Sequence, residues 1–132
     1  ISTAGKVKNI TYKVTDIEPS AFKGNTRLKK VTIGSNVTSI GANAFFNCIS
    51  LKSITIPANI KSIGKKTFYG CRNLKKVTIK TTKLTVSKVG ANAFKGIHKK
   101  AVMRVPKRKF SAYKNILKKK GAGAGVVYKK MS

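Results

Sequence analysis

Acidic residues are almost absent from this chain of 132 residues. Asp16 and Glu18 are its only two, against 30 Lys and Arg, and the formal net charge is +28. Because so few acids are available to neutralise the lysines, the chain should attract polyanions such as wall polymers, acidic glycans, anionic lipid or nucleic acid. General acid–base catalysis needs a base with an orienting partner. The single histidine, His98, has no acid nearby in sequence, so the composition argues against an enzyme.

Arginine is also scarce, with 4 Arg against 26 Lys. Arginine supplies a rigid fork for bidentate contacts, whereas lysine acts as a mobile, hydrated point charge. The excess of lysine therefore favours diffuse charge attraction over shaped recognition. A surface that is merely solvated and solubilising explains the charge equally well, and both interpretations stay open.

Long apolar runs are missing too. No stretch approaches the roughly 18 apolar residues that cross a bilayer, so no transmembrane segment is expected. No signal-peptide pattern is present, because Ile1 begins directly in polar, strand-like sequence. We interpret the chain as a fragment of a longer extracellular protein.

A repeat of 23 residues dominates what the chain does contain. Its leucines, phenylalanines and isoleucines recur at this interval, and the fourth members come 26 residues after the third. Three residues are therefore inserted in the segment 80–88. The repeating positions are Leu28, Leu51 and Leu74; Phe22, Phe45, Phe68 and Phe94; and Ile17, Ile40, Ile63 and Val89.

Each unit reads L-x-x-V/I-x-I-x-x-x-V/I-x-x-I-G-x-x-A-F-x-x-C. The V-x-I segment alternates with period two, as a strand with one buried face requires. A second short extended piece follows, and a tight turn then places Phe in the core. One unit buries too little apolar surface to offset the entropy of ordering its residues. The units must therefore stack as a solenoid.

These motifs resemble the BspA-like leucine-rich repeats of bacterial surface proteins. The resemblance covers roughly residues 14–106, and the tail VPKRKFSAYKNILKKKG is similar to the usual end of such arrays. It implies a leucine-rich-repeat solenoid: a β-rich right-handed coil with parallel strands on one face, short turns or 3-10 pieces, and a short C-terminal capping helix. Two positions depart from the pattern, since Asn25 and Ile97 stand where Cys48 and Cys71 stand in the middle units.

A single domain over residues 1–132 is expected, in three parts. Residues 1–13 form an N-terminal edge with an incomplete or hairpin-like first strand, in which Ile10 aligns with Ile33. Residues 14–106 form the repeats, and residues 107–132 the cap. In the cap, a helix over 110–120 covers the open end and stops at Gly121. GAGAG then turns the chain, and VVYKK returns as a terminal strand.

The two cysteines occupy equivalent inward positions of successive units. Neighbouring strands lie about 4.8 Å apart, so distance alone allows a bridge. Equivalent side chains on parallel strands point the same way, however, which fits disulfide geometry poorly. Free buried thiols are therefore expected. Two sulfurs and one His make no zinc site, and neither a metal nor another cofactor is expected.

Candidate binding residues lie on the expected sheet face. Lys29, Lys52 and Lys75 repeat directly after each Leu, with Lys30 and Lys76 beside them and Ser53 between. A second outward row of threonines (Thr32, Thr55, Thr78) continues into Arg104. A ladder of like charges is unfavourable unless anions bind to it. The alternative is that the long lysines simply spread into solvent.

Two aromatic residues, Phe46 and Tyr69, share an outward position that is Lys23 and Lys95 in the flanking units. They could stack on a sugar ring or hold a protein partner. Packing against the neighbouring unit is the explanation we favour. A third basic region, residues 99–109, has six positive charges in eleven residues, which is weak support for a heparin or nucleic-acid patch.

The sequence favours a non-catalytic cell-surface or secreted module for adhesion, which binds a protein, an acidic glycan or a wall polymer through the solenoid face. No small-molecule substrate is expected. A passive spacer of a larger surface protein is the main alternative. A nucleic-acid binder, non-specific at best, has the charge in its favour but few arginines, and the core phenylalanines are not free to stack on bases.

Overall fold

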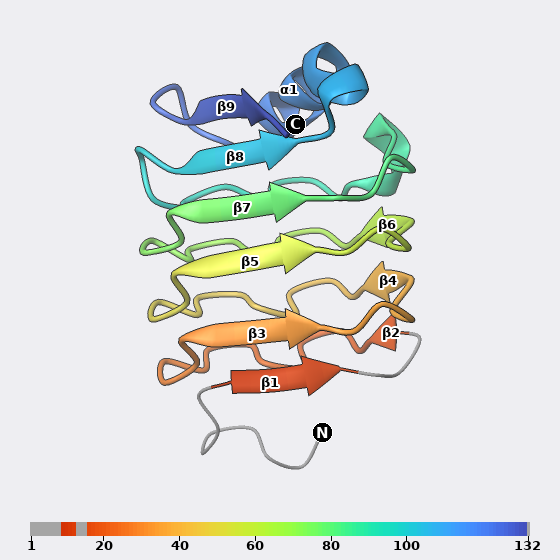
Figure 1. Ribbon diagram of the computed structural model, residues 1–132. Coiled ribbons are helices and arrows are strands. Elements are labelled where there is room, and N and C mark those ends of the chain that lie inside the picture. The colour runs from red at the N-terminus through yellow and green to blue at the C-terminus, as the bar shows by residue number, and fades with distance from the viewer. Residues whose placement is uncertain (1–8, 13–15, 132) are drawn as a thin grey trace.

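The computed structural model describes residues 9–12 and 16–131. The chain winds as a stack of coils, and each coil contributes one strand to a parallel sheet that runs the length of the molecule (Figure 1). This six-stranded sheet has the order β1 (Asn9–Tyr12), β3 (Lys30–Ile33), β5 (Ser53–Ile56), β7 (Lys76–Ile79), β8 (Val102–Val105) and β9 (Val127–Lys130). The predicted solenoid is confirmed.

A second, smaller parallel sheet is formed by the short extended pieces of the repeat. Its strands are β2 (Asp16–Ile17), β4 (Ser39–Ile40) and β6 (Ser62–Ile63). In the next coil Val89 extends it by a single bridge to Ile63. The 3-10 helix η1 (Val86–Lys88) precedes that bridge, within the inserted segment.

The repeating apolar residues form one continuous core between the two sheets. In β3 the residues alternate between exposed and buried, as the V-x-I pattern predicts. The inward phenylalanines stack from coil to coil with ring centroids 5.6, 5.4 and 5.4 Å apart, in the order Phe22, Phe45, Phe68 and Phe94. Every coil therefore seals the apolar face of the next.

Glycine at the end of each short extended piece lets the coils approach closely. A Cβ added to Gly64 would collide with the backbone of Ala42 in the coil below, and one added to Gly90 would collide with the backbone of Lys65. The backbone itself is the packing surface here, so only glycine fits.

The C-terminal cap consists of the 3-10 helix η2 (Lys107–Lys109), the helix α1 (Phe110–Lys119) and β9. One face of α1 is buried through Tyr113, Ile116 and Leu117, and Gly121 follows with a φ of 108°. The hydroxyl of Tyr113 donates to the Thr81 carbonyl at 2.8 Å and accepts from the Leu84 amide at 3.2 Å. Through these bonds, α1 is tied to the inserted segment.

The first strand differs from the sequence-based expectation. β1 is parallel to β3, so the hairpin-like alternative for this strand is wrong, and Ile10 pairs with Val31 rather than with Ile33. Three residues separate β1 from β2, whereas five separate β3 from β4. The shorter connection moves the register of β1 by two residues, so a fixed 23-residue interval does not apply to it.

Candidate functional site

The three lysines that follow the repeating leucines form a row at the start of the strands. The Lys52 amide donates to the Lys29 carbonyl at 3.3 Å, and the Lys75 amide donates to the Lys52 carbonyl at 3.0 Å. All three side chains are exposed. Lys29, Lys52 and Lys75 are named the lysine row below. It ends at the next coil, where the buried Ala101 lies opposite Lys75.

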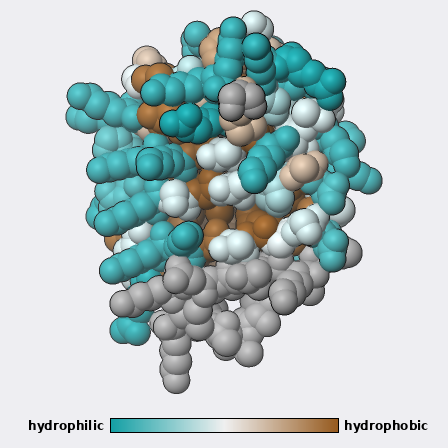
Figure 2. All heavy atoms as spheres, viewed as in Figure 1, coloured by the Kyte–Doolittle hydropathy of each residue, from teal (hydrophilic) through white to brown (hydrophobic). Residues whose placement is uncertain are grey.

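The neighbouring outward positions alternate between charged and hydroxyl side chains. Ser53 pairs with Lys30 on one side and with Lys76 on the other. In the threonine row, Thr78 pairs with Arg104, and Arg104 pairs in turn with Lys129 of β9. Figure 2 shows long hydrophilic side chains gathered along one side of this face. Lys129 was not predicted, because nothing in VVYKK fixes the register of β9.

Neither acid of the chain lies on the large sheet. Asp16 is in β2, where its Oδ1 accepts a hydrogen bond from the Ser39 hydroxyl at 2.6 Å. Glu18, which is exposed, follows directly after β2. The lysine row therefore has no counter-ion within the large sheet, and ions from solution must supply one.

Phe46 and Tyr69 stack on each other across two coils. Their ring centroids are 5.1 Å apart and their planes differ by 4°. The Lys23 Nζ lies 5.4 Å from the Phe46 centroid, and the Lys66 Nζ lies 5.5 Å from the Tyr69 centroid. Both rings are half-buried. This geometry favours packing between coils, with lysine over each ring, over an open platform for a sugar.

A hollow that the sequence analysis missed opens between β3 and β5. The two strands are paired only at Lys30 and Ser53. Beyond that pair lies a hollow of about 380 Å³, and Figure 2 shows apolar atoms in the middle of this face. We call it the hydroxyl hollow, because its polar lining includes Thr32, Ser35, Ser53 and Thr55.

Proline removes the last bond of this ladder. At the end of β5, the Ile56 carbonyl accepts from the Lys80 amide at 2.8 Å. Pro57 holds the position of Lys80 one coil earlier, and it has no N–H to donate to the Ile33 carbonyl. Pro57 is the signal in the sequence for the loss of this bond, although it does not show how far the pairing is lost.

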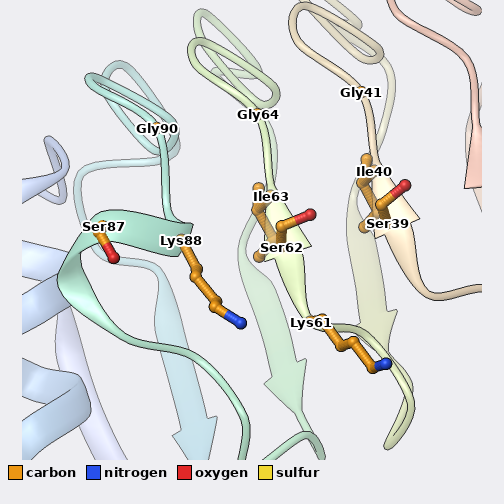
Figure 3. A pocket seen from close by; sticks show the side chains of 10 residues that line it. All are labelled: Ser39, Ile40, Gly41, Lys61, Ser62, Ile63, Gly64, Ser87, Lys88 and Gly90. Atoms are coloured by element: carbon orange, nitrogen blue, oxygen red, sulfur yellow. The ribbon is translucent and has the colours of Figure 1, made fainter.

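The small sheet carries a shallow hollow of about 540 Å³ (Figure 3). Hydroxyls of successive coils and two lysines surround it: Ser39, Ser62, Ser87, Lys61 and Lys88. The Ser39 hydroxyl is already bonded to Asp16. This hollow therefore begins beside the acidic end of the molecule.

The two thiols are buried and free, as predicted. The Cys48 thiol donates to the Phe22 carbonyl at 3.1 Å, and the Cys71 thiol donates to the Phe45 carbonyl at 3.0 Å. Burial raises the pKa of each thiol from 9.0 to about 12. At neutral pH both thiols are therefore protonated, and the nucleophilic thiolate form is scarce.

His98 stabilises a turn. Its Nδ1 accepts a hydrogen bond from the Lys100 amide at 3.0 Å. Within residues 9–12 and 16–131, no group of three or more His, Cys, Asp or Glu side chains could hold a metal ion. Across the same residues, no helix has the length and apolar character needed to span a bilayer.

Known proteins with the same repeat share this architecture. The family model described as "BspA type Leucine rich repeat region (6 copies)" matches residues 4–119. A solved leucine-rich repeat protein from Bacteroides ovatus is similar over 96% of this chain, with 29% identity and a TM-score of 0.76. The chain spans only 30% of that protein. No curated protein matches the chain.

Proposed function

This chain belongs to the BspA-type leucine-rich-repeat family, and we propose that it is an adhesion module that binds anionic polymers through its sheet face. Proteins of this fold and family are typically non-catalytic binding modules, and the family is typically surface-associated in bacteria. We further infer that the chain is extracellular and that its ligand site lies on the sheet face. Acidic glycans or wall polymers are the ligands that the charge favours.

The lysine row carries this proposal. Three exposed lysines directly precede the consecutive strands β3, β5 and β7, and neighbouring strands lie about 4.8 Å apart. Two unit charges about 5 Å apart in water repel by roughly 0.8 kcal/mol. An anionic chain that runs along the row would relieve this repulsion and release its own counter-ions. Lys30, Lys76 and Arg104 would extend the contact across the sheet.

The decisive experiment compares retention on immobilised heparin, teichoic acid, mucin glycans and DNA, each eluted with salt. The variant Lys29→Ser/Lys52→Ser/Lys75→Ser should elute from the preferred polymer at lower salt. If each lysine neutralises one anion, the slope of log K against log salt should fall by about 2. Lys61→Ser/Lys65→Ser/Lys88→Ser is the matched control, because it removes three exposed lysines from elsewhere.

Equal effects of the two triple variants would mean that net charge alone attracts the polymers. A protein that binds none of them near physiological salt would favour the passive spacer instead. Tighter retention on DNA than on every glycan would favour nucleic acid as the ligand. Each of these results would overturn the adhesion proposal as stated.

A further inference from the structure

Two hollows of the surface share one lining residue, Lys80. This residue lines the hydroxyl hollow between β3 and β5. It also lines a larger hollow of about 670 Å³ near the cap, which we call the basic hollow. The other residues of the basic hollow are Pro106, Lys107, Arg108, Lys130 and Met131. A ligand longer than one sugar ring could therefore occupy both.

The basic hollow lies at the carboxyl ends of three strands. Lys80 follows β7, Pro106 follows β8, and Lys130 ends β9. Because these strands are parallel, their ends meet at one edge of the sheet (Figure 1). The hydroxyl hollow lies toward the same edge, beside Pro57.

Both hollows form where a strand is followed by proline. Pro106 has no N–H for the Ile79 carbonyl, and the register of β7 with β8 stops at Thr78 and Arg104. In the next ladder the equivalent residue, Met131, does donate its amide to the Val105 carbonyl at 2.8 Å. The β7–β8 ladder therefore lacks its last bond, as the β3–β5 ladder does, although its first three pairs are formed.

Four cations surround the basic hollow, and none of the described residues that line it is acidic. Lys80, Lys107, Arg108 and Lys130 are all exposed. The Lys130 Nζ lies 5.3 Å from the Phe110 ring centroid, a cation–π contact that holds it toward α1. Asp16 and Glu18 belong to the first coils of the stack. Among the described residues no acid lies beside these cations, so an anion from solution can be their counter-ion.

We propose that the two hollows together bind a saccharide that carries a phosphate or sulfate ester. The ester lies in the basic hollow, where the Arg108 fork suits the paired oxygens of such a group. The sugar ring lies in the hydroxyl hollow, where Thr32, Ser35 and Thr55 offer hydroxyls above an apolar floor. Within residues 9–12 and 16–131, no aromatic residue lines either hollow, which disfavours a nucleic acid held by base stacking.

Titration of the whole chain, followed by NMR or calorimetry at constant ionic strength, tests this site. The probes are a sulfated disaccharide, its phosphate-ester counterpart, the same disaccharide without ester, and inorganic sulfate and phosphate. An ester should bind at least five-fold more tightly than the corresponding inorganic ion, and the uncharged disaccharide more weakly than either ester. Thr32→Val/Thr55→Val should remove the advantage of the ester over the ion.

Charge variants separate this site from diffuse attraction. Lys107→Ser/Arg108→Ser should weaken ester binding at least ten-fold, and Arg108→Lys, which keeps the charge without the fork, about five-fold. Lys61→Ser/Lys88→Ser removes two exposed lysines of the small sheet and should change the affinity less than two-fold. Thermal melting of each variant shows whether the fold is retained.

Several results would overturn the proposal. One is that the matched control weakens ester binding equally, and another is that inorganic ions bind as tightly as the esters. The others are that neither ester binds, or that a short oligonucleotide binds more tightly at the same residues. The site does not depend on the lysine row. Replacement of Lys29, Lys52 and Lys75 by Ser should leave ester affinity within two-fold, so failure of one proposal is distinguishable from failure of the other.

Discussion

At the scale of single residues, the tight turn of each repeat contains two positions with left-handed backbone. The second holds glycine or asparagine, whereas the first holds a variety of side chains. At the first position φ is 55–59° in all four coils, through Ser20, Asn43, Lys66 and Asn92. Left-handed backbone costs an ordinary L residue about 1–2 kcal/mol, and asparagine tolerates it better. Lys66 is therefore the strained member of this set.

Replacing the strained lysine should stabilise the protein. Lys66→Asn is expected to raise the free energy of unfolding by about 0.5 kcal/mol, because relief of backbone strain outweighs loss of the exposed contact with Tyr69. Denaturant unfolding measures the change. Lys65→Asn removes the same charge at a neighbouring exposed position without left-handed backbone and should not stabilise. Equal gains in the two variants would point to charge instead of strain.

The buried thiols make stability depend on alkaline pH. Each has a pKa of about 9 when unfolded and about 12 in the folded chain. Below pH 9 the two thiols are protonated in both the folded and the unfolded chain, and their burial contributes its full stabilisation. As pH rises from 9 toward 12, only the unfolded chain loses these protons, so the free energy of unfolding should fall. In Cys48→Ala/Cys71→Ala this decline should be shallower, and identical slopes would contradict the assignment.

At the scale of elements, the Tyr113 side chain joins the inserted segment to α1. The Tyr113 hydroxyl satisfies both the Thr81 carbonyl and the Leu84 amide in a buried setting. Tyr128, from β9, is the contrasting case, because its hydroxyl oxygen is buried without a hydrogen-bond partner in the part of the chain that is described. The two tyrosines therefore offer a matched comparison.

Removal of the first hydroxyl should destabilise the cap. Tyr113→Phe leaves two buried backbone groups unsatisfied, and we expect a loss of about 2 kcal/mol in the free energy of unfolding. Tyr128→Phe removes a hydroxyl that makes no bond and should be neutral or slightly stabilising. Chemical denaturation of the two variants side by side checks the difference. Similar losses in both would show that the Tyr113 hydroxyl does not anchor α1.

Sequence reasoning succeeded where apolar residues set the structure. The spacing of Leu28, Leu51 and Leu74 predicts the stacked coils, and the spacing of Phe110, Tyr113 and Leu117 predicts α1. It failed for β1, because the length of the connection to β2, not the apolar pattern, sets the register of that strand. The hollows were also missed, because they are lined by residues of different coils, and the apolar spacing does not show where a ladder loses its pairs.

At the scale of the whole molecule, the charge of +28 works against compactness. Apart from two acids at the start of the stack, every charge on the chain is positive, so the folded state concentrates like charges. The fold is maintained by its continuous core of apolar side chains. Screening should therefore increase stability.

Thermal melting in salt tests this balance. Raising NaCl from about 10 mM to about 500 mM shortens the screening length from about 30 Å to less than 10 Å. We expect the midpoint of unfolding to rise by about 5 °C, which for a domain of this size corresponds to roughly 1 kcal/mol. Sucrose at equal osmolality is the control. A midpoint that is unchanged or lower in salt would mean that repulsion among the lysines does not limit stability.

The residue after a strand can change the surface of a coil independently of its apolar core. The core residues of a coil decide whether the stack forms, whereas the residue just after the strand decides whether the last bond of the neighbouring ladder forms. A single codon at the position of Gly34, Pro57, Lys80 or Pro106 could add or remove this bond and reshape the surface beside it while leaving the hydrophobic interior untouched. Arrays of this kind can therefore acquire new specificities along their length without repeated redesign of the scaffold.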